Sequence, residues 1–241
     1  MKAKQDWIEK EKKNAALEAV KHVKDGFIVG LGSGSTAAYA IEEIGKRIKN
    51  EALHVLGVPT SYQALLLAVK HRIQITTLEE HPALDLTIDG ADQIDEELNL
   101  IKGMGGALAR EKIVASASKK FVIVADESKK VKVLGENNHP VPIEALLFAV
   151  PVLMQKIKEI GGKPNLREGI KKVGPVITDN GNVVIDVNFG LINNPLKMEH
   201  EIKGFPGVVE VGLFAKMADV VYLGTRSTVE KIERKNVGVT G

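Results

Sequence analysis

The chain has 241 residues, of which 44% are hydrophobic, enough to bury the core of one large domain or two smaller ones. Its 33 basic and 31 acidic residues are dispersed, and the net charge of +2 indicates no nucleic-acid-binding surface. The absence of cysteine excludes disulfides, thiolate metal sites and thiol catalysis. We find no signal peptide and no run of 18 apolar residues, so we expect no membrane partner and a cytoplasmic location.

Short β-branched runs alternate with amphipathic segments in the first half of the chain. The runs cover residues 27–30, 54–58, 84–88 and 121–125. Between them, apolar residues recur at helical spacing. This alternation predicts an α/β fold, in which a Rossmann-like parallel sheet is flanked by helices and the carboxyl ends of the strands form the binding edge.

The first of these runs ends in the glycine-rich stretch GLGSGSTA, residues 30–37. Glycine lets backbone N–H groups approach a ligand, hydroxyls add donors, and a following helix adds partial positive charge, so the stretch favours a phosphate. Position 35 is serine and not the last glycine of a dinucleotide fingerprint, and no Walker A lysine follows. A plain strand-to-helix turn capped by Ser35 or Thr36 is the alternative.

Two carboxylates follow the third run, where Asp89 and Asp92 flank Gly90 and Ala91. At the end of a parallel strand they could orient sugar hydroxyls, transfer protons or bind a hard cation. Solvated loop acids are the alternative.

A second glycine-rich loop, KGMGGALAREKIVA at residues 102–115, begins with Lys102 and enters a helix. On that helix Glu111 is flanked by Leu108 and Val114, among other apolar residues. An apolar setting raises the pKa of a carboxyl group toward that of a useful general base. A surface charge paired with its basic neighbours is the alternative.

The fourth run is followed by ADESKK, residues 125–130, which brings Asp126 and Lys129 to the same edge. Several loops with donors and carboxylates at one edge predict a functional site more strongly than any single loop does. The six histidines have no metal-ligand spacing and do not join these loops, so we expect no metal.

The second half has a different pattern, which begins at NHPVPIEALL, residues 138–147. After a helical stretch to Ile160, PVITDNGNVVIDV at 175–187 predicts a hairpin around Asn-Gly. A helix at 195–202 and a run at 207–215 complete a small α+β domain. The last run, 219–225, is apolar enough to return to the first sheet.

These motifs together resemble the type A family of ribose-5-phosphate isomerases. The resemblance rests on GLGSGSTAAYAI, DGADQID, KGMGGALAREKI, TDNGNVVIDV and PGVVEVGLFA, which run in order through nearly the whole chain. It implies a catalytic α/β domain of residues 1–137 plus 212–241, with a ferredoxin-like α+β domain inserted at 138–211. It also implies interconversion of ribose 5-phosphate and ribulose 5-phosphate through an enediolate, without a cofactor, in a homodimer or homotetramer.

The resemblance also assigns roles to residues. Glu111 is the expected base, Asp89 and Asp92 contact the sugar and help to open its ring, and Lys102 stabilises the oxyanion. The expected substrate-binding set is Ser33, Gly34, Ser35, Thr36, Asp89, Gly90, Ala91, Asp92, Lys102, Gly103, Met104, Gly105 and Lys129. Two alternatives remain open: a sugar-phosphate sensor without turnover, and a sugar-phosphate deaminase or lactonase on a related fold.

Overall fold

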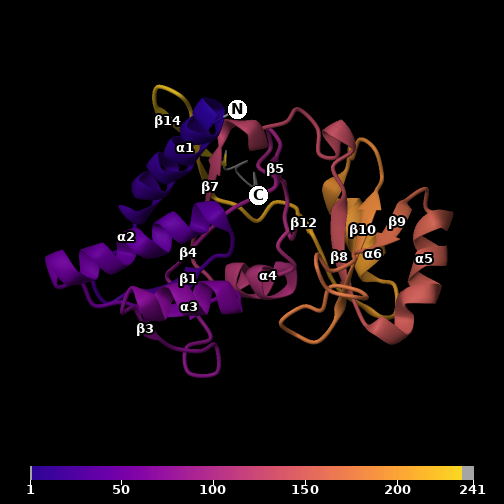
Figure 1. Ribbon diagram of the computed structural model, residues 1–241, viewed down its shortest axis with the longest axis horizontal. Helices are drawn as coiled ribbons and strands as arrows, with labels where there is room; N and C mark the ends of the chain where they lie inside the picture. Colours follow the sequence, from indigo (N-terminus) through magenta and orange to yellow (C-terminus); the bar gives the residue numbers. More distant parts are fainter. Residues whose placement is uncertain (1, 235–241) are drawn as a thin grey trace, which may run out of the picture.

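The largest sheet of the computed structural model, which describes residues 2–234, has seven strands in the order β14-β13-β7-β4-β1-β2-β3 (Figure 1). Six of these strands are parallel, and only the β13–β14 pair is antiparallel. The strands are β1 (Ile28–Leu31), β2 (Leu56–Pro59), β3 (Gln74–Ile75), β4 (Leu86–Asp89), β7 (Phe121–Asp126), β13 (Val220–Gly224) and β14 (Val229–Glu233). The predicted parallel sheet is confirmed, and the last apolar run returns to it as β13.

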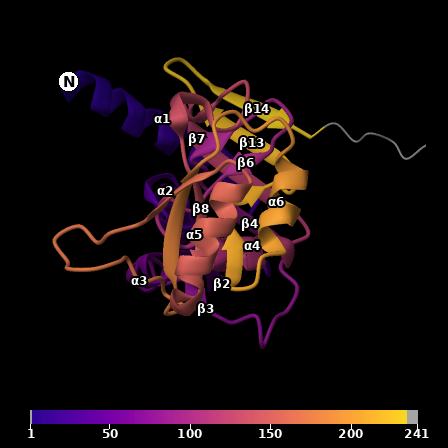
Figure 2. The same cartoon turned by 90° about the vertical axis from the view of Figure 1, so that its right-hand side faces the viewer.

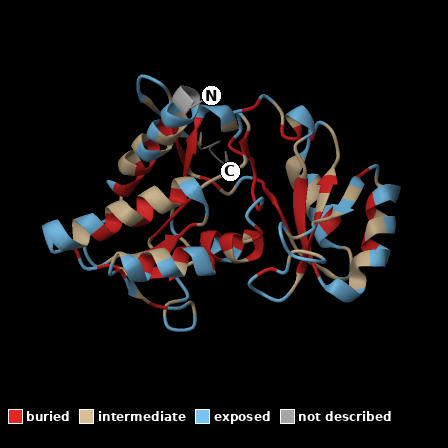
Figure 3. Cartoon of the chain, viewed as in Figure 1, coloured by how far each residue is buried: buried red, intermediate tan, exposed pale blue. Residues whose placement is uncertain are grey.

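The helices of this part cover the sheet, and the second and third begin just after strands β1 and β2 end. Side chains of the first three helices share one core cluster with the sheet, whereas α4 contributes to the clusters that contain Val114 and Ala115. The sheet strands in Figure 3 are largely buried, as expected for β-branched runs covered on both faces. The helices are α1 (Lys2–Val20), α2 (Ser35–Glu51), α3 (Tyr62–Lys70) and α4 (Leu108–Ser116).

A four-stranded antiparallel sheet with two helices forms the second half of the fold, on the right of Figure 1. Its elements follow the chain order β8-α5-β9-β10-α6-β11, and its strand order is β11-β8-β10-β9. This is the ferredoxin-like arrangement that was expected. The elements are β8 (Val141–Ala145), α5 (Val150–Glu159), β9 (Lys163–Leu166), β10 (Val183–Asn188), α6 (Pro195–Lys203) and β11 (Val208–Val211).

The hairpin predicted at residues 175–187 is wrong in its first strand. Only one bridge, between Ile177 and Val183, joins its two arms. β10 pairs instead with β9, a strand that the sequence pattern did not predict. Residues 167–182 therefore form a long connection that projects from the small domain, as the orange loop of Figure 2 shows.

A third, small sheet joins the two halves through β5 (Gln93–Ile94), β6 (Leu100–Ile101) and β12 (Leu213–Phe214). The run predicted at 207–215 is divided between β11 and β12 at Gly212, where a Cβ atom would lie 2.4 Å from the Lys102 carbonyl oxygen. The amide of Lys102 donates to the Gly212 carbonyl at 2.8 Å. Lys102, which directly follows β6, is thus tied to the residue that follows the last strand of the small domain.

The remaining elements are three 3-10 turns, η1 (Glu127–Lys129), η2 (Glu136–Asn138) and η3 (Leu147–Ala149). None of the helices within residues 2–234 combines the length and the apolar character that a membrane span needs. The predicted domain limits at 137/138 and 211/212 stay predictions, and residues 235–241 of the predicted catalytic domain lie outside the described part.

Candidate active site

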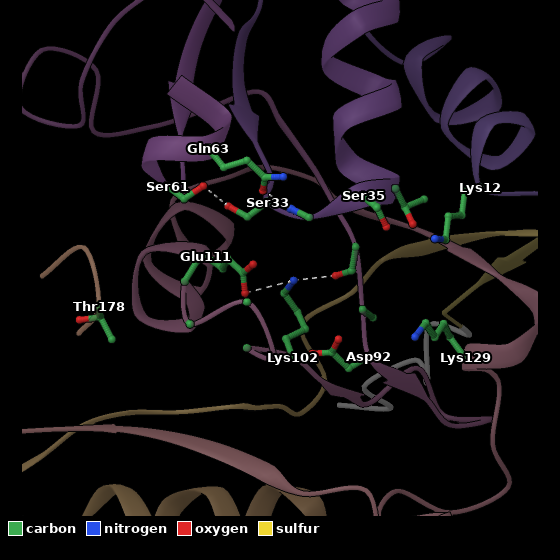
Figure 4. A pocket seen from close by; sticks show the side chains of 18 of the residues that line it. Lys12, Ser33, Ser35, Ser61, Gln63, Asp92, Lys102, Glu111, Lys129 and Thr178 are labelled. Atoms are coloured by element: carbon green, nitrogen blue, oxygen red, sulfur yellow. Dashed lines mark hydrogen bonds and ion pairs between the residues drawn. The ribbon is translucent and has the colours of Figure 1, made fainter. Parts of the chain in front are cut away.

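A pocket of about 470 Å³ opens at the carboxyl ends of β1, β4 and β7 and extends to the small domain (Figure 4). This volume suits a small-molecule ligand. The predicted catalytic and binding residues that line it are Ser33, Gly34, Ser35, Thr36, Gly90, Ala91, Asp92, Lys102, Gly103, Gly105, Glu111 and Lys129. The parallel sheet therefore brings loops from distant parts of the sequence to one site.

Lys102 lies at the centre of the pocket floor, and only 2% of its side chain is exposed. Its Nζ atom donates to the carbonyl oxygen of Gly90 at 2.6 Å. The same atom forms ion pairs with Asp89 Oδ2 at 3.0 Å and Glu111 Oε2 at 3.3 Å. A single ammonium group thus holds two carboxylates at the bottom of the site.

Burial raises the pKa of Glu111 to about 8, although the ammonium of Lys102 opposes the shift. Burial alone would lower the pKa of Lys102, but Asp89 and Glu111 more than offset that effect and raise it above its ordinary value. Lys102 is therefore charged, and Glu111 titrates near the pH at which a general base works best. Glu111 is buried in the first turn of α4, but the group beside its carboxylate is the Lys102 ammonium and not an apolar side chain.

Asp89 is fully buried beneath Lys102 and does not line the pocket. Its Oδ1 atom accepts hydrogen bonds from the amides of Gly90, at 2.7 Å, and Ser33, at 3.0 Å. Glycine is required at position 32 because a Cβ there would lie 2.5 Å from the Asp89 Cα atom. The expected direct contact of Asp89 with a ligand therefore finds no support, since its side chain joins the first loop to Lys102 instead.

One end of the pocket suits an anion. Ser35 and Thr36 begin α2 there, after Gly34 adopts a φ of 97° that favours glycine. The first N–H groups of a helix have no partner within it, and they carry partial positive charge. Lys129 lies at this end, as expected, together with Lys12 of α1 (Figure 4).

The glycine-rich loop between β6 and α4 forms another wall. Its Met104 amide donates to Asp92 Oδ2 at 3.0 Å, which fixes that carboxylate at the pocket edge. The Met104 residue itself is 42% exposed and does not line the pocket. Met104 is therefore the one predicted residue of this loop that does not line the pocket.

Ser61 and Gln63, which follow β2, were not identified from the sequence. The hydroxyl of Ser33 donates to Ser61 Oγ, and the Gly34 amide donates to Gln63 Oε1 at 2.8 Å. Both residues line the pocket. Loops that follow parallel strands meet at one edge of the sheet, and this applies to the loop after β2 as well. The same reasoning would therefore have identified Ser61 and Gln63.

The long connection from the small domain closes the far side of the pocket with Thr178 and Asp179. From the sequence, its TDNGN motif predicts the turn of a hairpin and belongs to the family resemblance, with no role in the site. The Asp179 carboxylate accepts a hydrogen bond from the Tyr62 amide at 2.8 Å, and Arg110 donates to the Asp179 carbonyl at 2.9 Å. The buried Glu144 carboxylate accepts from the Thr178 hydroxyl at 2.9 Å. The loop is thus held from both halves of the fold.

Metal ligands do not cluster in the part of the chain that the structure describes: no three His, Asp or Glu side chains there are placed to bind an ion. Within the same residues, no histidine lines the pocket. The arrangement instead combines a carboxylate of raised pKa, a buried cation and an anion-binding end.

Comparison with known proteins gives consistent matches. The family model described as ribose 5-phosphate isomerase A (phosphoriboisomerase A) matches residues 56–228. A ribose-5-phosphate isomerase A from Methanosarcina acetivorans is 51% identical over 92% of this chain and 93% of the relative. One from Pyrococcus horikoshii is 47% identical over 94% of this chain and 99% of the relative.

Solved structures match over similar lengths. A D-ribose-5-phosphate isomerase in complex with phospho-erythronic acid has a TM-score of 0.92 and 46% identity, and the match covers 94% of this chain and 99% of that one. The ribose 5-phosphate isomerase A of Methanocaldococcus jannaschii has a TM-score of 0.90 and 47% identity, with 93% and 99% covered. The fold and the order of its elements are therefore those of these structures.

Proposed function

The chain belongs to the ribose 5-phosphate isomerase A family, and from this premise we propose that it interconverts D-ribose 5-phosphate and D-ribulose 5-phosphate. The observation that carries the proposal is the buried Glu111 carboxylate, with its pKa raised to about 8, which faces the pocket beside the charged Lys102. Moving a carbonyl between C1 and C2 requires one base and one stabiliser of negative charge.

Glu111 takes the proton from C2 of the open-chain aldose. The C2–H electron pair then forms the C1–C2 double bond, and the carbonyl electrons move to O1 to give an enediolate. Return of the same proton to C1, with loss of the hydroxyl proton from O2 and protonation of O1, gives the ketose. A carboxylate with a raised pKa suits both transfers, because it accepts and releases a proton near neutral pH.

The negative oxygen of the enediolate requires donors that are in place before the reaction. Lys102 supplies a fixed positive charge there, and the amides at Gly103 and Gly105 add dipoles. When the sugar ring opens, Asp92 accepts the proton of the anomeric hydroxyl and delivers a proton to the ring oxygen O4 as its bond to C1 breaks. We assign Asp89 to holding Lys102, because its carboxylate lies 3.0 Å from the ammonium and away from the pocket surface.

The phosphate of the substrate binds at the start of α2. Ser35 and Thr36 supply donors there, and Lys12 and Lys129 supply charge. Figure 4 supports this arrangement, because Lys12 and Lys129 lie together at one end of the pocket, Glu111 lies toward the other end, and Lys102 lies between them. Binding energy from a remote phosphate can hold the reacting carbons at Glu111.

The decisive experiment is turnover of ribose 5-phosphate by the purified protein with a chelator present. Ribulose 5-phosphate should form, and in deuterated water part of it should carry deuterium at C1. Binding of ribose 5-phosphate without any turnover would support a sensor and contradict the proposal. The homodimeric or homotetrameric state and the cytoplasmic location stay predictions, which light scattering and cell fractionation can test.

A further inference from the structure

Arg167 reaches from the small domain to the glycine-rich loop of the pocket. It directly follows β9, and its Nε atom donates to Asp186 Oδ2 on β10 at 2.7 Å, with a second contact from Nη2 to Oδ1. Its remaining nitrogen, Nη1, donates to the carbonyl oxygens of Met104 at 2.8 Å and Gly103 at 3.2 Å. One guanidinium group therefore joins the small-domain sheet to two consecutive peptide groups of the loop.

These two peptide groups are the ones that shape the site. In a trans peptide the C=O and the N–H of the next residue point in opposite directions. The peptide after Gly103 is held on both sides, by Arg167 at its oxygen and by Asp92 at the Met104 amide, 3.0 Å away. The peptide after Met104 has its oxygen on Arg167, so the N–H of Gly105, which lines the pocket, points away from Arg167.

We propose that Arg167 is a positioning residue for the reaction, an inference that rests on the isomerase function proposed above. It fixes the Gly105 amide and the Asp92 carboxylate in the orientation that the enediolate requires. The side chain itself lies outside the pocket lining, so it acts only through the loop. The inserted domain is thereby part of the catalytic apparatus and not only a neighbouring fold.

The chemistry requires arginine at this position. Asp186 occupies two donors of the planar guanidinium, and the third nitrogen is then directed at the loop. Lysine offers a single charged nitrogen on a flexible chain and cannot hold this fork geometry. The side chains of Arg167 and Asp186 are only 13% and 18% exposed, so water competes little for the hydrogen bonds between them.

A matched control exists elsewhere in the chain. Arg47 also donates to one carboxylate, that of Glu51, and to two backbone carbonyls, those of Val20 and Val23. It does not line the pocket. Replacement of Arg47 therefore removes the same kinds of contact without touching the glycine-rich loop.

The experiment compares Arg167→Met, Arg167→Lys, Asp186→Asn and Arg47→Met by steady-state kinetics with ribose 5-phosphate. Misplacing catalytic groups by about 1 Å costs up to roughly a hundredfold in rate. We expect Arg167→Met to lower kcat by about 10- to 100-fold while KM changes less than about threefold. The kcat of Arg167→Lys should lie between the values for Arg167→Met and the wild type. Asp186→Asn retains Arg167, so its kcat should fall less than that of Arg167→Met. It provides a second test if Arg167→Met does not fold.

Two further readouts separate positioning from a general loss of structure. The affinity for phospho-erythronic acid, whose carboxylate has the charge of an enediolate, should fall by the same factor as kcat/KM in Arg167→Met. Amide exchange at Met104, followed by NMR, should become faster in Arg167→Met and stay unchanged in Arg47→Met. This measurement does not depend on turnover, so an inactive wild type would refute the isomerase function and leave the positioning role testable.

The proposal is overturned if Arg167→Met keeps kcat within about twofold of the wild type, or if only KM rises. It is also overturned if Arg47→Met loses as much kcat as Arg167→Met, because the loss would then reflect stability and not the loop.

Discussion

The Asp89 carboxylate and the Lys102 ammonium lie 3.0 Å apart, with 0% and 2% of their side chains exposed. A charge removed from water needs a partner, and the loss of one member of a buried pair leaves the other uncompensated. This pair is therefore structural and, in the proposed reaction, also serves catalysis: Asp89 holds the cation that stabilises the Glu111 carboxylate and the enediolate.

Lys102→Met should consequently reduce both activity and stability. We expect kcat and kcat/KM to fall together by roughly 10²- to 10³-fold, as on losing one oxyanion donor. The free energy of unfolding should fall by about 3–5 kcal/mol, because Asp89 is left buried and unpaired. Kinetics and denaturant unfolding measure the two effects.

The double variant Lys102→Met with Asp89→Asn separates the effect on activity from the effect on stability. Removing the orphaned charge should recover much of the lost stability without restoring kcat. A double variant with near-normal turnover would show that Lys102 has no role in the chemistry.

Glu111→Gln keeps the size of the side chain but removes the basic oxygen. We expect kcat to fall by at least about 10²- to 10⁴-fold, the range attributed to general acid–base catalysis, with little change in substrate affinity. Steady-state kinetics and calorimetric binding of phospho-erythronic acid measure the two quantities. An active Glu111→Gln variant would refute the assignment of the base.

The pH profile should report the same residue. Because burial raises the pKa of Glu111 to about 8, the inactive protonated form dominates at lower pH. kcat/KM should therefore rise with pH and level off above pH 8, with about a tenfold change per pH unit on the acid side. The phosphate of the substrate titrates near pH 6, about where other phosphate monoesters do, so its contribution is distinguishable. A flat profile between pH 6.5 and 9 would contradict a titrating base.

Lys129→Ala and Lys12→Ala should mainly raise KM. A phosphate contact is made equally in the ground state and the transition state, so its loss weakens binding more than turnover. We expect an increase of about 10- to 100-fold for each, in line with the ~1.5–3 kcal/mol of a charge-assisted hydrogen bond, and a reduced sensitivity of KM to salt. Lys132→Ala is the matched control, because Lys132 is exposed and does not line the pocket. A normal KM with a strongly reduced kcat would show instead that the lysine takes part in the chemical step.

Local patterns in the sequence determined the frame of this site. The alternation of β-branched runs with amphipathic segments depends on neighbouring residues, and it predicted the parallel sheet and the edge at which its loops meet. The burial of Glu111 agrees with the same local pattern, because Leu108 and Val114 lie one turn away from it on the same helix and are buried too. Such features need no knowledge of distant contacts.

Only the tertiary structure determines which residues far apart in the sequence contact one another. Asp89 and Asp92 have the same chemistry and lie three positions apart, yet one is buried under Lys102 and the other lines the pocket. Residues 175–178 have the composition of a strand, but β9 pairs with β10 in their place, and the freed segment becomes a wall of the site. Lys12 sits in a charged helix with no local sign of a role and reaches the pocket only because α1 packs against β7 and β13. In each case the outcome depends on which segments pack together, and that choice minimises the free energy of the whole fold rather than of any one segment.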